Sequence, residues 1–195
     1  MNLRIDRKLN LVIPIDRDDG ARIYIHSTPI SLAVFEAHYL VMAKTFAAIY
    51  NEGLGVTAGP RVAAMTMKKI AENLGVWAGE GGVESSLVNE MKRLTNVLAP
   101  GANGWDTVPY SEAVKRGIID EDEASEVENA LAFFTVAYRL HRKTEREAIL
   151  NGASRLWGGE ISSLPFTEFR NSLPTSTPAA NTGASQMATA SSVPI

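Results

Sequence analysis

The chain has 195 residues, of which 45% are hydrophobic and 21% charged, and its formal net charge is -3 at pH 7. This is the composition of a globular protein with one sizeable core, and the weak acidity gives no electrostatic footprint for nucleic acid or an anionic membrane. The absence of cysteine excludes disulfides, thiol nucleophiles and cysteine metal sites. The N-terminus lacks the apolar stretch of a signal peptide, and no run reaches 18 apolar residues. We therefore expect a cytosolic protein with no membrane span.

Two short apolar runs near the N-terminus alternate with polar residues at a period of two, which predicts a β-hairpin over about residues 9–27. A three-residue loop from Asp18 to Gly20 would put Gly20 in the left-handed conformation that such loops require. This loop sets a register that pairs Ile15 with Ile23, Ile13 with Ile25 and Asp16 with Arg22. Pro14 has no amide proton to donate, so we expect it at an unpaired edge.

The stretch from Ile30 to Gly53 is the strongest helical signal in the chain. Its apolar residues recur at alternating steps of three and four, as on one helix face: Leu32, Phe35, Tyr39, Met42, Phe46 and Ile49. Other apolar side chains fill most of the remaining circumference and leave Glu36 and Lys44 as a narrow charged line. A helix that is apolar nearly all round is typical of a protein interior, so the pattern predicts the central helix, capped by Ser31.

Two further helices are predicted before residue 99. Pro60 suits the first turn of the earlier one, which buries Ala63, Met67, Ile70 and Leu74. The glycines just before it match a dinucleotide-binding pattern by letters only, because no strand precedes them, so a loop is expected there. The later helix, over residues 84–98, buries Leu87, Met91, Leu94 and Leu98 and ends at Pro100. Residues 99–110 are then expected to form a loop, in which Trp105 and Tyr110 either pin the loop to the domain surface or contact a partner.

Three helical segments are expected in the C-terminal half. A short one spans residues 111–117, and a long one begins at Asp120, with Glu123 in the reciprocal capping position. The inward stripe of the long helix is Ala124, Val127, Leu131, Phe134 and Tyr138. Residues 145–157 either continue this helix or form a separate final helix, and Gly152 marks a point where the helix can break.

The composition changes after Gly158. Leu164, Phe166, Phe169 and Leu173 can dock a short turn, but no charged residue follows Arg170, and the stretch 174–195 is Ser, Thr, Ala, Pro and other small or polar residues with few apolar ones. Such a segment cannot bury enough apolar surface to offset its ordering entropy, so disorder is predicted. The predicted fold is therefore mainly α. Residues 1–173 form a single domain, an N-terminal β-hairpin packed on a bundle of five to six helices, and a disordered tail follows.

No catalytic, cofactor or metal motif is recognisable. The histidines His26, His38 and His141 lack metal-ligand spacing, no serine lies in a nucleophile elbow, and the glycine cluster at 79–82 lacks the lysine of a phosphate loop. We therefore predict a protein that is not an enzyme and that binds neither cofactor nor metal.

Six segments, taken in order, resemble a tail assembly chaperone of long-tailed bacteriophages: LNLVIPIDRDDGARIYIHSTPIS, AIYNEGLG, GPRVAAM, RLTNVLAPGANGW, EVENALAFFTVA and TEFRNSLPTSTP. The similarity covers residues 1–177. It implies a mostly helical protein of the host cytoplasm that is absent from the finished virion, binds the tape-measure protein and helps recruit tail-tube subunits. The resemblance carries over no individual functional residue. A homo-oligomer is a further association that we consider.

Two functions are open on the sequence alone. The first is a non-catalytic chaperone that covers apolar helical surface on its client; without a phosphate loop it would act as a stoichiometric holdase. The alternative is a structural virion component, such as a tail or head-completion subunit. The predicted client-binding surface is the neighbourhood of Trp77, Trp105 and Tyr110, because large aromatics in glycine-rich loops are the apolar groups least committed to a core.

Overall fold

The computed structural model describes residues 9–18, 20–102, 104–155 and 158–174. Within these ranges the chain forms seven α-helices, one π-helical segment and a five-stranded antiparallel sheet. The prediction of a mainly α protein with a single hairpin is correct only in part, because three more strands join the hairpin and make the fold α/β. The predicted tail, from residue 175 onward, lies outside the described residues.

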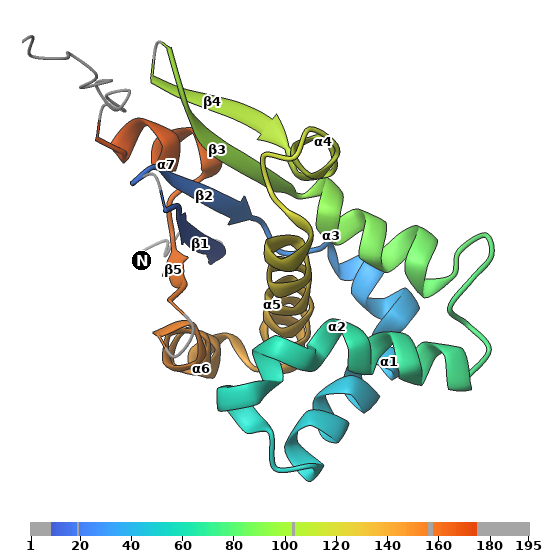
Figure 1. The fold of residues 1–195 in the computed structure, drawn as a ribbon. Helices are drawn as coiled ribbons and strands as arrows, with labels where there is room; N and C mark the ends of the chain where they lie inside the picture. The colour runs from blue at the N-terminus through green and yellow to red at the C-terminus, as the bar shows by residue number, and fades with distance from the viewer. Residues whose placement is uncertain (1–8, 19, 103, 156–157, 175–195) are drawn as a thin grey trace, which may run out of the picture.

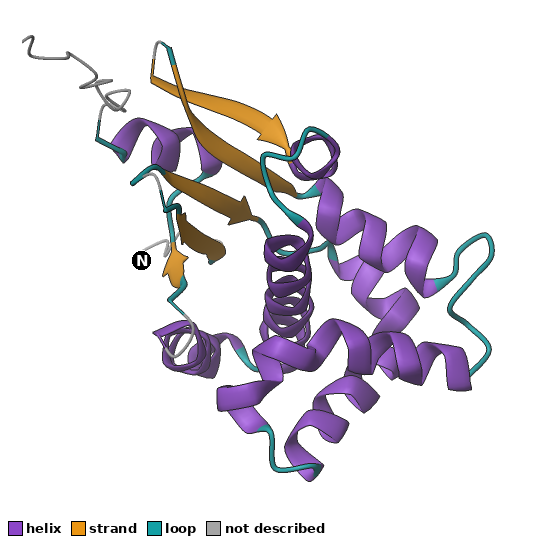
Figure 2. Cartoon of the chain, in the orientation of Figure 1, coloured by secondary structure: helices purple, strands orange, loops and turns teal. Residues whose placement is uncertain are grey.

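The elements follow one another in a mixed order. The strands are β1 (Asn10–Asp16), β2 (Arg22–Ser27), β3 (Thr95–Gly101), β4 (Gly104–Pro109) and β5 (Glu160–Ser162). The helices are α1 (Leu32–Asn51), α2 (Gly55–Asn73), α3 (Asn89–Arg93), α4 (Tyr110–Lys115), α5 (Glu121–Leu140), α6 (Lys143–Arg155) and α7 (Phe166–Ser172), and the π-helical segment η1 (Val83–Val88) leads into α3. Figure 2 shows the strands gathered at one end of the molecule and most helices at the other.

The predicted hairpin register is confirmed. β1 and β2 pair Ile15 with Ile23, Ile13 with Ile25 and Asp16 with Arg22. Gly20 has a φ of 81°, and the Arg17 amide donates to the Ala21 carbonyl oxygen at 2.8 Å to close the turn. β5 covers β1 only from Asn10 to Val12, so Pro14 lies beyond the paired stretch of that edge, as expected.

Both faces of the sheet are covered. The strands are in the order β4-β3-β2-β1-β5. On one face Val97 joins the main core with the helices, whereas on the other Leu98 packs with Val12 and with Phe169 of α7. Consecutive residues of β3 are therefore both buried. A strand covered on two sides loses the period-two alternation by which it would be recognised in sequence.

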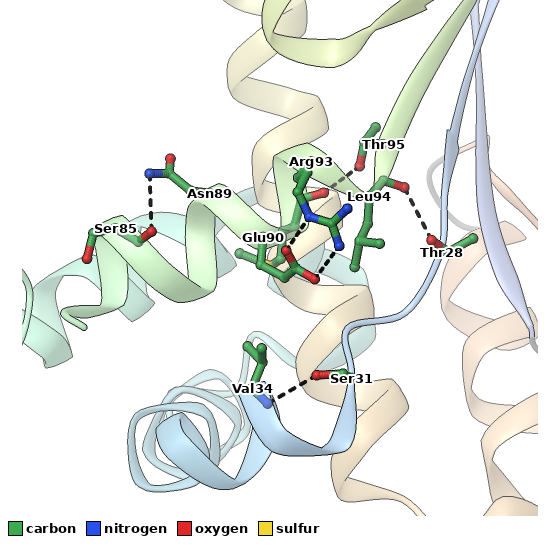
Figure 3. Close-up of polar contacts among 10 residues, drawn as sticks. Thr28, Ser31, Val34, Ser85, Asn89, Glu90, Arg93, Leu94 and Thr95 are labelled. Atoms are coloured by element: carbon green, nitrogen blue, oxygen red, sulfur yellow. Dashed lines mark hydrogen bonds and ion pairs between the residues drawn. The ribbon is translucent and has the colours of Figure 1, made fainter. Parts of the chain in front are cut away.

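The prediction of one helix over residues 84–98 is wrong beyond Arg93. The Thr95 hydroxyl donates to the Met91 carbonyl oxygen at 2.8 Å, which satisfies an end carbonyl of the helix. Figure 3 shows the same transition, where Thr28 of the neighbouring segment reaches the Leu94 carbonyl oxygen. From Thr95 the chain is β3, and the predicted loop at 99–110 is instead the β3–β4 hairpin followed by the start of α4. The helical period of Leu87, Met91, Leu94 and Leu98 therefore continued by coincidence into a strand.

α5 is the central helix. Every residue from Asn129 to Tyr138 is buried, and the helix passes between α2 and the sheet. Its predicted start is confirmed. The Asp120 side chain accepts from the Glu123 amide at 2.8 Å, and the Glu123 side chain accepts from the Asp120 amide at 2.9 Å.

The prediction that α1 is central is wrong. Its buried residues are His38, Val41, Met42, Thr45 and Ile49, whereas Leu32 and Tyr39 are 58% and 57% exposed. The buried polar side chains have partners inside the protein: the Thr45 hydroxyl donates to the Val41 carbonyl oxygen at 2.8 Å, and His38 Nε2 lies 2.5 Å from Ser86 Oγ. The inward face is thus marked by polar residues that sequence alone would place outside. The Ser31 cap is confirmed, because its hydroxyl accepts from the Val34 amide (Figure 3).

α2 packs unusually closely on its neighbours. It begins at Gly55, so Pro60 lies within the helix and not in the predicted first turn. A Cβ atom added at Gly59 would lie 2.7 Å from Ile49 Cγ2 and 2.8 Å from Phe133 Cε2. Both of those side chains are buried in the core. Hydrogen at this position is therefore what allows α2 to approach α1 and α5 together.

We predict that Gly59→Ala destabilises the protein by about 1 to 3 kcal/mol, the usual cost of overpacking, despite the better helix propensity of alanine. Gly152→Ala in α6 is the matched control, since no atom lies within 4 Å of the added Cβ. The control should be neutral or stabilising by up to about 1 kcal/mol. Urea unfolding monitored by circular dichroism measures both. Equal stability of the two variants would contradict the close packing.

The outer face of the sheet buries a histidine. The His26 ring lies on β2 with its centroid 5.4 Å from Phe166 and 5.3 Å from Phe169, both in α7. Its Nε2 is 3.4 Å from the Leu164 carbonyl oxygen, and burial lowers the pKa of His26 below its ordinary value. Because the unfolded chain binds a proton at higher pH than the folded chain, the folded state loses stability as the pH falls below about 6.5.

We predict that His26→Gln makes this loss of stability in acid shallower than in wild type. Urea unfolding at several pH values from about 7 down to about 5 gives the free energy of unfolding at each pH. His38 contributes a slope of the same sign, because burial lowers its pKa too, so the comparison is between the wild-type and His26→Gln slopes. Identical slopes would show that His26 titrates alike in the folded and unfolded chain.

Candidate functional site

The structure does not bring Trp77, Trp105 and Tyr110 together, and Tyr110 is not available to a partner. Tyr110 is 1% exposed at the start of α4, so the expectation that it is uncommitted to the core is wrong. Its hydroxyl lies 3.2 Å from the Ala124 carbonyl oxygen and 3.4 Å from Glu128 Oε1. Burial, and then the negative charge of Glu128, raise the pKa of Tyr110 well above its usual range. Tyr110 fastens α4 to α5.

Trp105 serves the fold from the outer face of the sheet. Its ring on β4 packs edge to face against Tyr24, with the centroids 5.3 Å apart. Its Nε1 donates to the Pro174 carbonyl oxygen at 2.8 Å. Phe166, Leu173 and Trp105 belong to the same small apolar cluster. Trp105 therefore holds the end of the described chain against the sheet, which sequence reasoning did not foresee.

We predict that Trp105→Ala lowers the free energy of opening of the α7 segment by about 1 to 2 kcal/mol, through loss of the hydrogen bond to Pro174 and of apolar packing in the cluster that contains Phe169. Trypsin cleavage at Arg170 under native conditions reports this opening. Trp105→Phe, which keeps a ring but no N–H, should give an intermediate rate. Trp77→Ala is the control and should leave cleavage at Arg170 unchanged; equal rates for all variants would show that Trp105 does not hold α7.

Trp77 borders an open groove. It lies in the connection after α2, partly buried against the core. The groove has a volume of about 360 Å³ and separates α2 from η1, α3 and α5. We call it the Trp77 groove; its apolar lining is Ala64, Met65, Met67, Trp77, Val88, Met91, Leu131 and Ala132, and its polar lining includes Lys68, Glu84, Lys92, Glu128 and Asn129.

The rim of the groove carries both signs of charge. Lys68 Nζ lies 5.5 Å from the centroid of the Trp77 ring and 4.0 Å from a Glu72 carboxylate oxygen. On the opposite side, Lys92 Nζ is 2.8 Å from Glu128 Oε1. These pairs are partly exposed, so they are worth little to stability and can exchange partners on binding. Lys68 and Lys92 belong to no local sequence motif, because the rim is formed by helices that are far apart in the chain.

At the floor of the groove, the polar side chain of Asn129 makes hydrogen bonds within the protein, and the floor carries no reactive group. Asn129 Oδ1 accepts from the Ala64 amide at 2.9 Å, and its Nδ2 donates to the Ser125 carbonyl oxygen at 2.9 Å. Across residues 9–174, leaving out 19, 103, 156 and 157, no cluster of three or more His, Asp or Glu side chains could hold a metal ion. The three histidines are spread among β2, α1 and the end of α5. The groove is thus suited to binding an apolar surface.

Comparison with known proteins assigns no family to the chain. No protein-family model, curated protein or solved structure matches it. The resemblance to tail assembly chaperones therefore stays a prediction made from six sequence segments.

Proposed function

We propose that this protein is a non-catalytic holdase that binds an apolar helical segment of another protein in the Trp77 groove. More specifically, we propose that it is a bacteriophage tail assembly chaperone whose client is the tape-measure protein and which helps recruit tail-tube subunits in the host cytoplasm. The groove is the observation that carries the first statement. The sequence resemblance supports the second.

The shape of the groove favours a helix. Its walls are themselves helices, α2 on one side and η1 with α3 on the other, and α5 forms the floor. A helix laid between such walls can bury side chains spaced by three and four residues. Binding energy at such surfaces concentrates on a few large residues, and Trp77 is the only aromatic among the described lining residues.

Met65 supports a role in recognition. It lines the groove and is 58% exposed on α2, so its side chain is accessible to a partner. Methionine is flexible and polarisable, so it can adapt to client segments that differ in sequence. A chaperone that binds a long client must accept segments of different sequence. This tolerance matters more than an exact fit to one segment.

The charges on the rim of the groove indicate which residues should border the apolar stripe of a client helix. Two lysines, Lys68 and Lys92, and two glutamates, Glu84 and Glu128, line the groove. A client helix with an apolar stripe bordered by charges of both signs can replace the existing pairs without leaving a buried charge unpaired. Strongly acidic or basic ligands would meet like charge on one side.

The test is co-expression of the tape-measure protein with variants on α2 and beside it. Met65→Ala and Trp77→Ala should each weaken client binding by about 1 to 3 kcal/mol, the usual cost of removing an interface anchor. Lys69→Ala is the matched control, because Lys69 is exposed on α2 and lines neither this groove nor the groove beside α1. The readout is the fraction of client that stays soluble and co-purifies.

Three results would count against the proposal. Wild-type levels of soluble client with folded Met65→Ala and Trp77→Ala would remove the groove from the site. A requirement for ATP would exclude the holdase mechanism. Abundant peptides of this chain in purified particles would favour the alternative, a structural virion component.

A further inference from the structure

The side of α1 that faces away from the core is exposed and largely apolar. Leu40, at its centre, is 48% exposed, and Tyr39 lies beside it. One line of exposed residues runs along this side, and we call it the α1 outer face: Ala33, Glu36, Ala37, Leu40, Lys44 and Ala47. Next to it, a groove of about 500 Å³ is lined in part by Tyr39, Leu74 and Val76 and extends the apolar surface. An exposed apolar patch of this extent marks a contact with another molecule.

The α1 outer face is arranged symmetrically about Leu40. Glu36 lies four residues before Leu40 and Lys44 four residues after it; Ala33 lies seven before and Ala47 seven after. If two copies of α1 lie antiparallel with their Leu40 residues opposed, Glu36 of each copy comes level with Lys44 of the other. Ala33 and Ala47 are then opposed at both ends, and small residues there let two helices approach closely.

The two charges select this arrangement. Within the described part of the chain, the ion pairs include neither Glu36 nor Lys44. They are eight residues apart, about 12 Å along one helix, too far to pair with each other. A parallel pairing would oppose Glu36 to Glu36 and Lys44 to Lys44, whereas the antiparallel pairing makes two opposite-charge contacts.

We propose that two copies of this chain form a two-fold symmetric dimer through the α1 outer face, with the α1 helices antiparallel about Leu40. An interface on a two-fold axis must be self-complementary, and the α1 outer face meets this condition in the placement of its charges and of its small residues about Leu40. The dimer does not depend on the identity of the client. No described lining residue of the Trp77 groove belongs to α1, so the α1 contacts proposed for the dimer do not use the groove.

A lipid bilayer is the other occupant to consider. α1 has 20 residues, and its most apolar 18-residue window has a mean hydropathy of 1.4 and is only 28% buried, so by length and composition alone it could cross a membrane. Core helices of ordinary proteins pass the same test. The line of residues that would face lipid includes Glu36 and Lys44, and charges at membrane depth are costly. In a dimer the same two charges contribute to binding.

Sedimentation velocity of the full chain, over about 1 to 100 μM protein, tests the dimer. Wild type should shift with concentration from 21.1 kDa to twice that mass. Leu40→Asp should remain monomeric. Glu36→Lys and Lys44→Glu should each raise the dissociation constant about tenfold or more, because each opposes like charges twice. The combined Glu36→Lys/Lys44→Glu chain should regain dimerisation to within about threefold of wild type.

Controls separate this surface from general effects of charge or apolar exposure. Met65→Asp removes an exposed apolar residue elsewhere, and Glu52→Lys makes the same charge change just beyond α1; both should dimerise as wild type does. All substituted positions are exposed, so every variant should remain folded. Each should therefore show a cooperative thermal unfolding transition. A wild-type mass that stays at 21.1 kDa, or a dimer unaffected by Leu40→Asp, overturns the proposal. So does a double variant that fails to recover. Flotation of a monomeric wild type with neutral lipid vesicles, lost in Leu40→Asp, would assign the face to a membrane instead.

Discussion

The close packing of α2 on α5 at Gly59 is the constraint on which the rest of the structure depends. A side chain at this position would meet Phe133 of α5 and Ile49 of α1 at less than 3 Å, so the glycine sets how near three helices lie. α5 can then be buried along its C-terminal half between α2 and the sheet. With α5 enclosed there, α1 is left at the outside with one face on the core and one face free. The exposed apolar surface of α1 is thus a consequence of how the interior is filled.

A second constraint comes from the sheet, which must be covered on both faces. The helices cover one face, and the chain returns after α6 to add β5 at the edge of the sheet and to cover the other face with α7. Two large aromatic residues, Trp105 and Tyr24, form part of the surface on which α7 packs, and His26 is buried beneath α7. Trp105, which sequence reasoning assigned to a partner, is therefore occupied within the molecule. Of the three predicted aromatics, only Trp77 borders a groove.

The parts of the fold that could be read from sequence are those specified by residues close together in the chain. The hairpin register follows from alternation and Gly20, and the start of α5 follows from Asp120 and Glu123. The position of α1 could not be predicted from sequence, because a helix that is apolar on all sides does not reveal which face is buried. In addition, two residues of its buried face, His38 and Thr45, are of polar types that sequence reasoning places outside. β3 was missed because a strand buried on both faces has no alternation, and because Leu98 continued the helical period of Leu87, Met91 and Leu94. The Trp77 groove depends on α2, α3 and α5 meeting in space, which no local pattern records.

The two proposed surfaces have a joint consequence for a long client. If two chains pair through the α1 outer face, each dimer carries two Trp77 grooves with fixed separation. A client with apolar segments repeated along its length can then occupy both grooves, and the second binding event becomes intramolecular. The overall affinity can exceed that of one groove by about 10² to 10⁴ without any new contact, provided that the span between segments matches the span between grooves. Weak, tolerant contacts by Met65 and Trp77 would then suffice for retention, and release would require only that successive segments be withdrawn one at a time.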